Sequence, residues 1–145
     1  MLEIKLQSDD LRANLDQLVT RIKDRKALLR QVGEIEKEDI QRRIQIGKRS
    51  PSGVPWAPWR PSTAIYRQRK GTASKGLLFD SGALYRSFKL KQDGDQVTVG
   101  TNVKYAPYLQ FGTPKMNARP FMGLSKEATR SIAVLLDNFI NLPRK

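Results

Sequence analysis

The spacing of apolar residues divides the first third of the chain into a strand and two helices. Leu2, Ile4 and Leu6 alternate with charged residues, which is the period of a short half-buried strand. Ser8 and Asp9 offer N-cap oxygens to a helix over about residues 9–24, with one apolar face formed by Leu11, Leu15, Leu18, Val19 and Ile22. A second apolar series predicts another helix, which Gly47 closes in a left-handed conformation; its members are Leu28, Leu29, Val32, Ile35, Ile40 and Ile44. The charged segment 23–26 favours a break between the two helices.

The last third of the chain is predicted to form a hairpin followed by helices. Asp80 is placed to cap a short helix through Ser87, and residues 88–91 and 97–99 alternate around Asp93-Gly94-Asp95, a strong turn signal. Residues 105–111 predict a short helical turn, and Ser125 caps a final amphipathic helix. We therefore expect a single α+β domain over residues 1–145. Its small antiparallel sheet combines the N-terminal strand with a hairpin near 87–101, packed by two N-terminal helices and a C-terminal helix.

A long segment at about residues 47–76 interrupts these elements. Four prolines between residues 48 and 63 make regular structure unlikely there. Trp56 and Trp59 in this loop either fold back on the domain or meet another molecule, and we expect one of them to fold back. Ser62 or Thr63 is expected to cap a short helical turn, and residues 67–76 are expected to be mobile in the free protein. The segment is thus predicted to be an extended loop or arm.

Charge is concentrated in the same part of the chain. The sequence has 27 basic and 14 acidic residues, a net charge of +13, and residues 40–79 contain nine basic residues and no acid. The basic stretch at 42–75 is able to attract a polyanion or an acidic protein partner, although it is equally typical of a solvated loop. The candidate residues for such contacts are Arg60, Arg67, Arg69, Lys70 and Lys75.

The composition removes most catalytic chemistry. The chain has no Cys and no His, which excludes thiolate nucleophiles, disulfides, imidazole bases and the usual zinc ligands. Carboxylate chemistry remains open, but residues 34–39 have the pattern of a solvated helix, and Asp93 and Asp95 flank a turn glycine. We expect no enzyme, no cofactor, no metal and no small-molecule substrate. The chain has no apolar run long enough for a membrane span and no secretory signal at its start, so we expect folding in a cytoplasm without membrane contact.

Five segments of the chain together resemble a known family. In order they are residues 51–58 (PSGVPWAP), 78–87 (LFDSGALYRS), 99–106 (VGTNVKYA), 110–112 (QFG) and 118–125 (ARPFMGLS). Their order and spacing resemble the phage virion morphogenesis family, the tail-completion proteins of Mu-like contractile-tailed phages. The resemblance implies a structural protein that completes the tail or joins head to tail, as a homo-oligomeric ring at the neck of the virion. It also implies assembly in the bacterial host cytoplasm, with tail tube, sheath, neck or connector proteins as partners.

Ring formation has a physical requirement that the sequence is able to meet. Subunits arranged head to tail contact their neighbours through two different surfaces, so each needs a protruding element and a receiving groove. Residues 48–76 are the natural protrusion, and the aromatic residues at 105–121 either line the groove or belong to the core. We expect Tyr105 and Phe121 in the core and leave Tyr108 open. The interface candidates are Trp56, Trp59, Ile65, Tyr66, Tyr108 and Phe111.

Two further interpretations concern charge. The alternative function is a DNA-binding module, in which the 42–75 stretch neutralises phosphates and Trp56, Trp59 or Tyr66 stacks on bases. A ring at the neck also has the genome passing through it, so non-specific contact with DNA is compatible with either function. Arg119, in an apolar segment, is expected either on the surface or turned inward toward carbonyls or a carboxylate such as Asp80.

Overall fold

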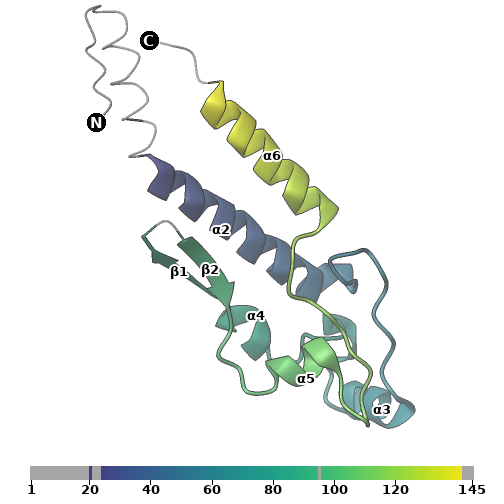
Figure 1. The fold of residues 1–145 in the computed structure, drawn as a ribbon. Coiled ribbons are helices and arrows are strands. Elements are labelled where there is room, and N and C mark those ends of the chain that lie inside the picture. Colours follow the sequence, from purple (N-terminus) through teal and green to yellow (C-terminus); the bar gives the residue numbers. More distant parts are fainter. Residues whose placement is uncertain (1–19, 21–23, 95, 142–145) are drawn as a thin grey trace, which may run out of the picture.

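The computed structural model describes residue 20, residues 24–94 and residues 96–141. It contains helices and a two-stranded antiparallel sheet, which confirms the predicted α+β class. In chain order the elements are α2 (Arg25–Arg42), the π-helical turn η1 (Arg43–Gly47), α3 (Pro61–Arg69), the 3-10 turn η2 (Ala73–Lys75), α4 (Ala83–Ser87), β1 (Lys89–Asp93), β2 (Gln96–Gly100), α5 (Ala106–Phe111) and α6 (Lys126–Ile140) (Figure 1). The strand predicted at residues 2–6 and nearly all of the helix predicted at 9–24 lie outside the described residues.

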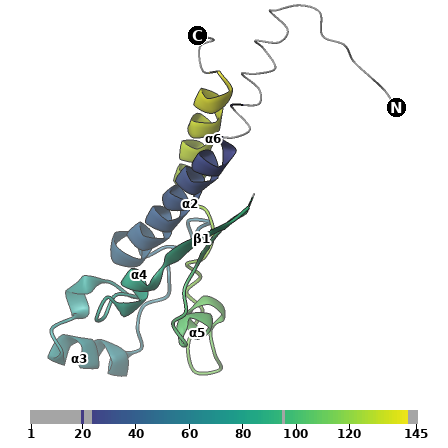
Figure 2. The same cartoon turned by 90° about the vertical axis from the view of Figure 1, so that its left-hand side faces the viewer.

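Helix α2 lies between the hairpin and α6, and it contacts both (Figures 1 and 2). Gly33 is buried where the hairpin crosses α2. A Cβ atom at this position would lie 2.5 Å from Leu90 Cδ1 and 2.7 Å from Val97 Cγ2. A glycine inside a helix destabilises it by about 1 kcal/mol relative to alanine, but here it allows the sheet to pack directly on the helix backbone.

The hairpin has the predicted position and turn. Its register pairs Lys89 with Gly100 and Asp93 with Gln96, so the connection is two residues long. Gly94 has a φ of 55°, which is the left-handed conformation that such turns require. The Asp-Gly signal therefore identified the hairpin, and the structure adds its register.

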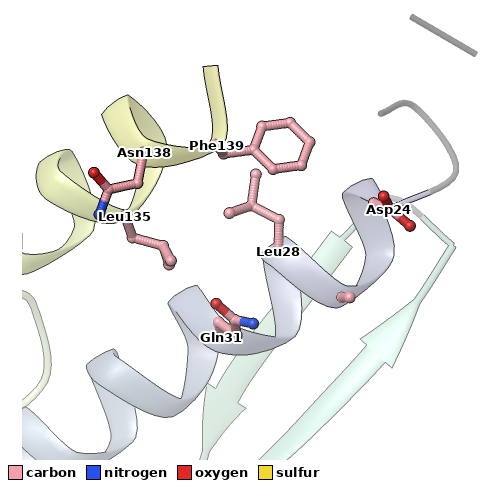
Figure 3. A pocket seen from close by; sticks show the side chains of 7 residues that line it. Asp24, Leu28, Gln31, Leu135, Asn138 and Phe139 are labelled. Carbon is pink, nitrogen blue, oxygen red and sulfur yellow. The ribbon is translucent and has the colours of Figure 1, made fainter. Parts of the chain in front are cut away.

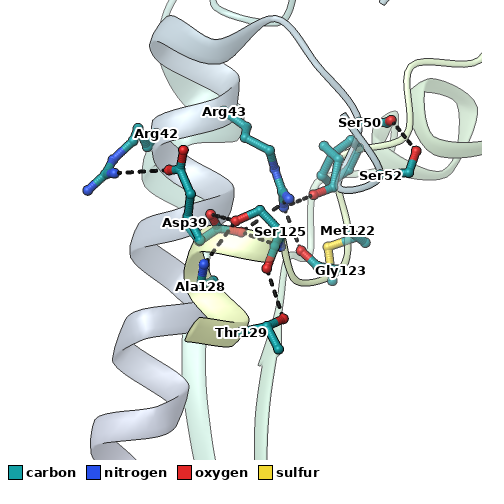
Figure 4. A network of polar contacts seen from close by, with 12 residues as sticks. Asp39, Arg42, Arg43, Ser50, Ser52, Met122, Gly123, Ser125, Ala128 and Thr129 are labelled. Carbon is teal, nitrogen blue, oxygen red and sulfur yellow. Dashed lines mark hydrogen bonds and ion pairs between the residues drawn. The ribbon is translucent and has the colours of Figure 1, made fainter. Parts of the chain in front are cut away.

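A buried polar network joins α2 to the start of α6 (Figure 4). Ser125 caps α6 as predicted, because its Oγ accepts the Ala128 N–H at 3.1 Å. Asp39 of α2 accepts hydrogen bonds from both the N–H and the hydroxyl of Ser125. Arg43 lies 3.1 Å from Asp39 through Nη1, and its Nη2 donates to the carbonyls of Phe121 and Gly123 at 2.8 and 2.6 Å. One buried ion pair thus fixes the segment before α6 against α2.

The hydrophobic core lies between the end of α2 and the segments that follow it in the chain. Its largest fully buried side chains are Phe121, Ile40, Ile44 and Leu84. The ring of Phe88 meets the ring of Phe121 edge-on, with centroids 5.9 Å apart. The expectation that Phe121 belongs to the core is confirmed, whereas the same expectation for Tyr105 is wrong. Tyr105 directly precedes α5 and lies on the side of that short helix that faces solvent.

Three local predictions need correction. The short turn expected after Ser62 or Thr63 is a nine-residue helix that begins at Pro61, since proline at the first position presets φ and needs no N–H partner. The left-handed residue after α2 is Lys48 (φ 50°) and not Gly47, because the wider π turn η1 continues the helix through Gly47 and the Lys48 N–H bonds back to the Arg43 carbonyl.

The third correction concerns the start of α4. This helix begins at Ala83, after Gly82 in the left-handed conformation, and not near Asp80. The carboxylate of Asp80 instead accepts a hydrogen bond from Lys70, so it is not free to cap the helix. Asp80 therefore ties the segment before α4 to Lys70, the residue that follows α3.

Candidate assembly surface

Two segments far apart in the sequence, 51–58 and 118–125, are bonded to each other. The indole Nε1 of Trp56 donates to the Pro120 carbonyl at 2.7 Å. Arg119 Nε donates to the Ala57 carbonyl at 2.8 Å, and Arg119 Nη2 donates to the Pro58 carbonyl at 2.9 Å. Arg119 is only 6% exposed. Of the two expected positions, its guanidinium therefore has the inward one, and its partners are backbone carbonyls. These motif residues form a clamp that joins the two segments.

Helix α5 is fixed to the same clamp. The side-chain oxygen of Gln110 accepts the backbone N–H groups of Phe121 and Met122, each at 3.0 Å. Gly112 then reverses the chain with a φ of 76°, and a Cβ there would lie 2.8 Å from the Ala118 nitrogen. Only glycine fits this reversal. The position of α5 is therefore set by hydrogen bonds on one side and by a tight turn on the other.

The outer side of α5 carries an exposed aromatic ridge, which we define as Tyr105, Tyr108 and Phe111. The exposed fractions of these residues are 45%, 58% and 79%. Their spacing of three places them on one side of the helix, whereas Ala106 and Leu109 face inward. Tyr105 was expected in the core, although its spacing of three from Tyr108 and Phe111 is a sequence signal that places it on the exposed side of α5.

Phe111 also forms part of the wall of a neighbouring apolar groove. The groove has a volume of about 450 Å³, and its apolar lining consists of Val103, Ala106, Pro107, Phe111, Phe121 and Met122. Contiguous apolar surface of this kind on a soluble protein marks an interaction site more often than an isolated exposed side chain does. The ridge and the groove together have the shape of a protein-binding surface.

The structure places the other interface candidates in two groups. Ile65 and Tyr66 are exposed on α3, at the same end of the molecule as α5 (Figures 1 and 2). Trp56 is buried in the core, and Trp59 is half-buried, with its Nε1 donating to the Leu77 carbonyl at 3.0 Å. Both indoles therefore fold back on the protein, where only one was expected to.

The basic candidates also divide into two groups. Arg67 is buried, stacks on the Trp59 ring at 4.9 Å and lies 3.2 Å from Asp80, and Lys70 lies 2.9 Å from the same carboxylate. The hydrogen bond from Lys70 holds the pKa of Asp80 below its ordinary value, and the charge of Arg67 acts in the same direction. In the described ranges, Arg60, Arg69 and Lys75 are exposed and form no ion pair.

A cavity of about 280 Å³ lies between α2 and α6 (Figure 3). Leu28 and Phe139 face each other across it, and Asp24 lies at its edge. Among the described residues that line it, Asp24 is the only ionisable one. Over the part of the chain that the structure describes, no cluster of acidic residues is arranged to hold a metal ion, and no helix is long and apolar enough to span a membrane.

Comparison with known proteins agrees with the resemblance seen in the sequence. The model of the phage virion morphogenesis family matches residues 6–141. Mu-like prophage FluMu G protein 1 of Haemophilus influenzae is 24% identical over 137 residues, which cover 94% of this chain and 92% of that protein. An uncharacterized protein of Methanocaldococcus jannaschii is 36% identical over 101 residues, covering 61% of this chain and 71% of that protein. No solved structure matches. Because the family model covers most of the chain, the chain belongs to the phage virion morphogenesis family.

Proposed function

We propose that this protein is a structural component of the virion that completes the tail or joins head to tail at the neck, and that it acts as a ring of identical subunits. Membership of the family supports a role in building the virion, and the relative from a Mu-like prophage supports a link to contractile-tailed phages. The observation that carries the proposal is the aromatic ridge on α5, a rigid apolar feature exposed to water.

The ridge has the properties of a binding surface that is covered on assembly. Fully burying a side chain such as Phe111 stabilises a complex by about 1.5–3 kcal/mol, and aromatic residues dominate the binding energy of many interfaces. The ridge belongs to a helix already held by Gln110 and by the turn at Gly112, so it needs no rearrangement before it binds.

A ring also needs a second, different surface on each subunit. Helix α3 supplies a candidate, because Ile65 and Tyr66 are exposed on it and are separate from the ridge. In the proposed ring, one subunit presents its ridge to a neighbour, and the remaining faces contact tail tube, sheath or connector proteins. Catalysis has no part in this function, and assembly takes place in the cytoplasm of the bacterial host.

The test is to remove the ridge without disturbing the clamp. We expect the double variant Tyr108→Ser, Phe111→Ser to keep the wild-type melting temperature but to associate at least about ten-fold more weakly, a loss of about 1.4 kcal/mol. Sedimentation velocity over a range of concentrations measures association, alone and with purified tails. Val54→Ser is the matched control, since Val54 is equally exposed but lies in the 48–56 loop. Wild-type protein that stays monomeric and binds neither tails nor heads refutes the proposal.

Contact with DNA is a second candidate function, favoured by the exposed side chains of Arg69 and Lys75. Binding through phosphates weakens steeply as salt rises, whereas association through the apolar ridge does not. We expect the double variant Arg69→Glu, Lys75→Glu to lose any retention of duplex DNA in a gel-shift assay. A wild-type protein that retains no DNA at moderate salt excludes this function and leaves the assembly role standing.

A further inference from the structure

A basic pocket lies between α3 and the turn that follows α5. It has a volume of about 250 Å³, and the described residues that line it include four basic ones and no acidic one. Its apolar walls include Trp59, Leu78 and Leu109. The basic residues of this pocket are Arg60, Arg67, Lys115 and Arg119.

Arg119 differs from the other buried arginines of the described residues. Arg43 has Asp39 at 3.1 Å, and Arg67 has Asp80 at 3.2 Å. Arg119 is just as buried but has only the carbonyls of Ala57 and Pro58, and no carboxylate lies within ion-pair distance of it in the described part of the chain. Burial lowers its pKa, with no opposing charge to offset the effect. A buried cation without a counter-ion is unfavourable, so this site lacks one charge.

We propose that the basic pocket binds a carboxylate side chain of another protein chain, which completes an ion pair with Arg119. Apolar walls strengthen such a pair, because charges interact more strongly where water is excluded. Arg60 and Lys115 are exposed at the rim, where they attract an approaching acid.

The size and depth of the pocket favour a carboxylate over DNA. Pockets that hold drug-sized ligands span about 300–1,000 Å³, so this pocket is suited to a single side-chain group. The phosphates of a duplex lie on the surface of a thick rod and do not reach a guanidinium that is 6% exposed. A flexible Asp or Glu side chain does reach it.

One source of the carboxylate is a second copy of this chain. Asp93 is exposed at the closed end of the hairpin, far from α3 in both views (Figures 1 and 2). A subunit is therefore unable to place Asp93 in its own pocket, whereas a neighbour arranged head to tail is able to do so. The other source is an acidic residue of a different virion protein, and the chemistry is the same.

The experiment follows the indole N–H signal of Trp59 by NMR during titration of the intact protein. The probes are glutarate, a blocked peptide of residues 89–100, the same peptide carrying Asp93→Asn and Asp95→Asn, inorganic phosphate and a short DNA duplex. The pocket variant is the double change Arg60→Ser, Lys115→Ser, which alters only exposed side chains, and Arg69→Ser is the matched control. We expect glutarate to shift the signal saturably, with affinity at least about ten-fold lower in the pocket variant and unchanged in the control.

The outcomes separate the sources of the carboxylate. If the hairpin peptide binds more tightly than its doubly substituted version, and Asp93→Asn weakens self-association as much as the pocket variant does, the neighbouring copy supplies the carboxylate. If glutarate binds, but the peptide substitutions and the Asp93→Asn variant have no effect, another virion protein supplies the carboxylate. Both results support the pocket.

Other outcomes overturn the proposal. These are no shift with any carboxylate probe, an equal loss of binding in Arg69→Ser, or preference of the pocket for phosphate or DNA. The ridge variant Tyr108→Ser, Phe111→Ser should still bind glutarate, because none of the ridge residues lines this pocket. A loss of glutarate binding is therefore distinguishable from a loss of subunit association, so the carboxylate pocket and the assembly role are tested separately.

Discussion

Removing the carboxylate of Asp39 should destabilise the fold more than any change to an exposed acidic residue. The variant Asp39→Ala leaves the buried guanidinium of Arg43 without its ion-pair partner at 3.1 Å. It also deprives the N–H and hydroxyl of Ser125 of their acceptor, at the residue that caps α6. The side chain of Asp39 thus both neutralises the buried charge of Arg43 and holds the residue that caps α6.

The expected loss in the free energy of unfolding of Asp39→Ala follows from these contacts. Breaking a buried ion pair by removal of one partner destabilises a protein by about 3–5 kcal/mol, because the other charge stays buried. For a chain of this size that loss lowers Tm by roughly 10 °C or more. Asp39→Asn keeps one oxygen for Ser125 while losing the charge, so we expect an intermediate effect.

Urea unfolding followed by circular dichroism measures the change, with Glu38→Ala as the matched control. Glu38 is the adjacent acidic residue of α2 and is exposed. We expect the control to lie within about 0.5 kcal/mol of wild type. If Asp39→Ala is no less stable than Glu38→Ala, the buried pair does not hold α6 against α2, and the reasoning above is wrong.

Three further changes test other parts of the structure. Gly112→Ala should destabilise the protein by about 2 kcal/mol or more, because it adds a backbone clash to the strain of positive φ, whereas Gly71→Ala meets no neighbour and should lose only about 1 kcal/mol in urea unfolding. Trp56→Phe removes the hydrogen bond to the Pro120 carbonyl and should destabilise by about 1 kcal/mol, measured as a fall in Tm. The pKa of Asp80 is lowered in the folded state, chiefly by its hydrogen bond from Lys70, so the stability it contributes is present above about pH 4 and is lost as pH falls further. The stability difference between wild type and Lys70→Met, followed by urea unfolding, should therefore shrink below about pH 4, and a difference independent of pH would contradict this assignment.

The elements predicted correctly from the sequence are those specified by local signals. The hairpin follows from Asp93-Gly94, because the positive φ of Gly94 is a property of the turn itself. The start of α6 follows from Ser125, whose hydroxyl bonds within its own helix. Neither feature depends on residues far away in the chain, so a single sequence is sufficient to identify both.

The features that the sequence did not reveal depend on long-range contacts. Asp39 of α2 and Arg43, the first residue of η1, are four residues apart, a spacing equally typical of a solvated helix face. Their burial depends on the carbonyls of Phe121 and Gly123, about 80 residues later. The same holds for Gln110, whose partners lie in the next segment, and for both tryptophans, whose acceptors are backbone carbonyls of distant loops. Side-chain types give no information on such partners.

The contacts that fix α5 have a consequence for the speed of the proposed assembly. A helix that must fold before it binds loses conformational entropy at the moment of contact, which slows productive encounters. In this protein the hydrogen bonds of Gln110 and the reversal at Gly112 order the helix in the free subunit. The side chains of Tyr105, Tyr108 and Phe111 have only two rotatable χ angles each, so little freedom remains to be lost. In the proposed ring, a free subunit therefore already has its binding surface in place and docks as a rigid body.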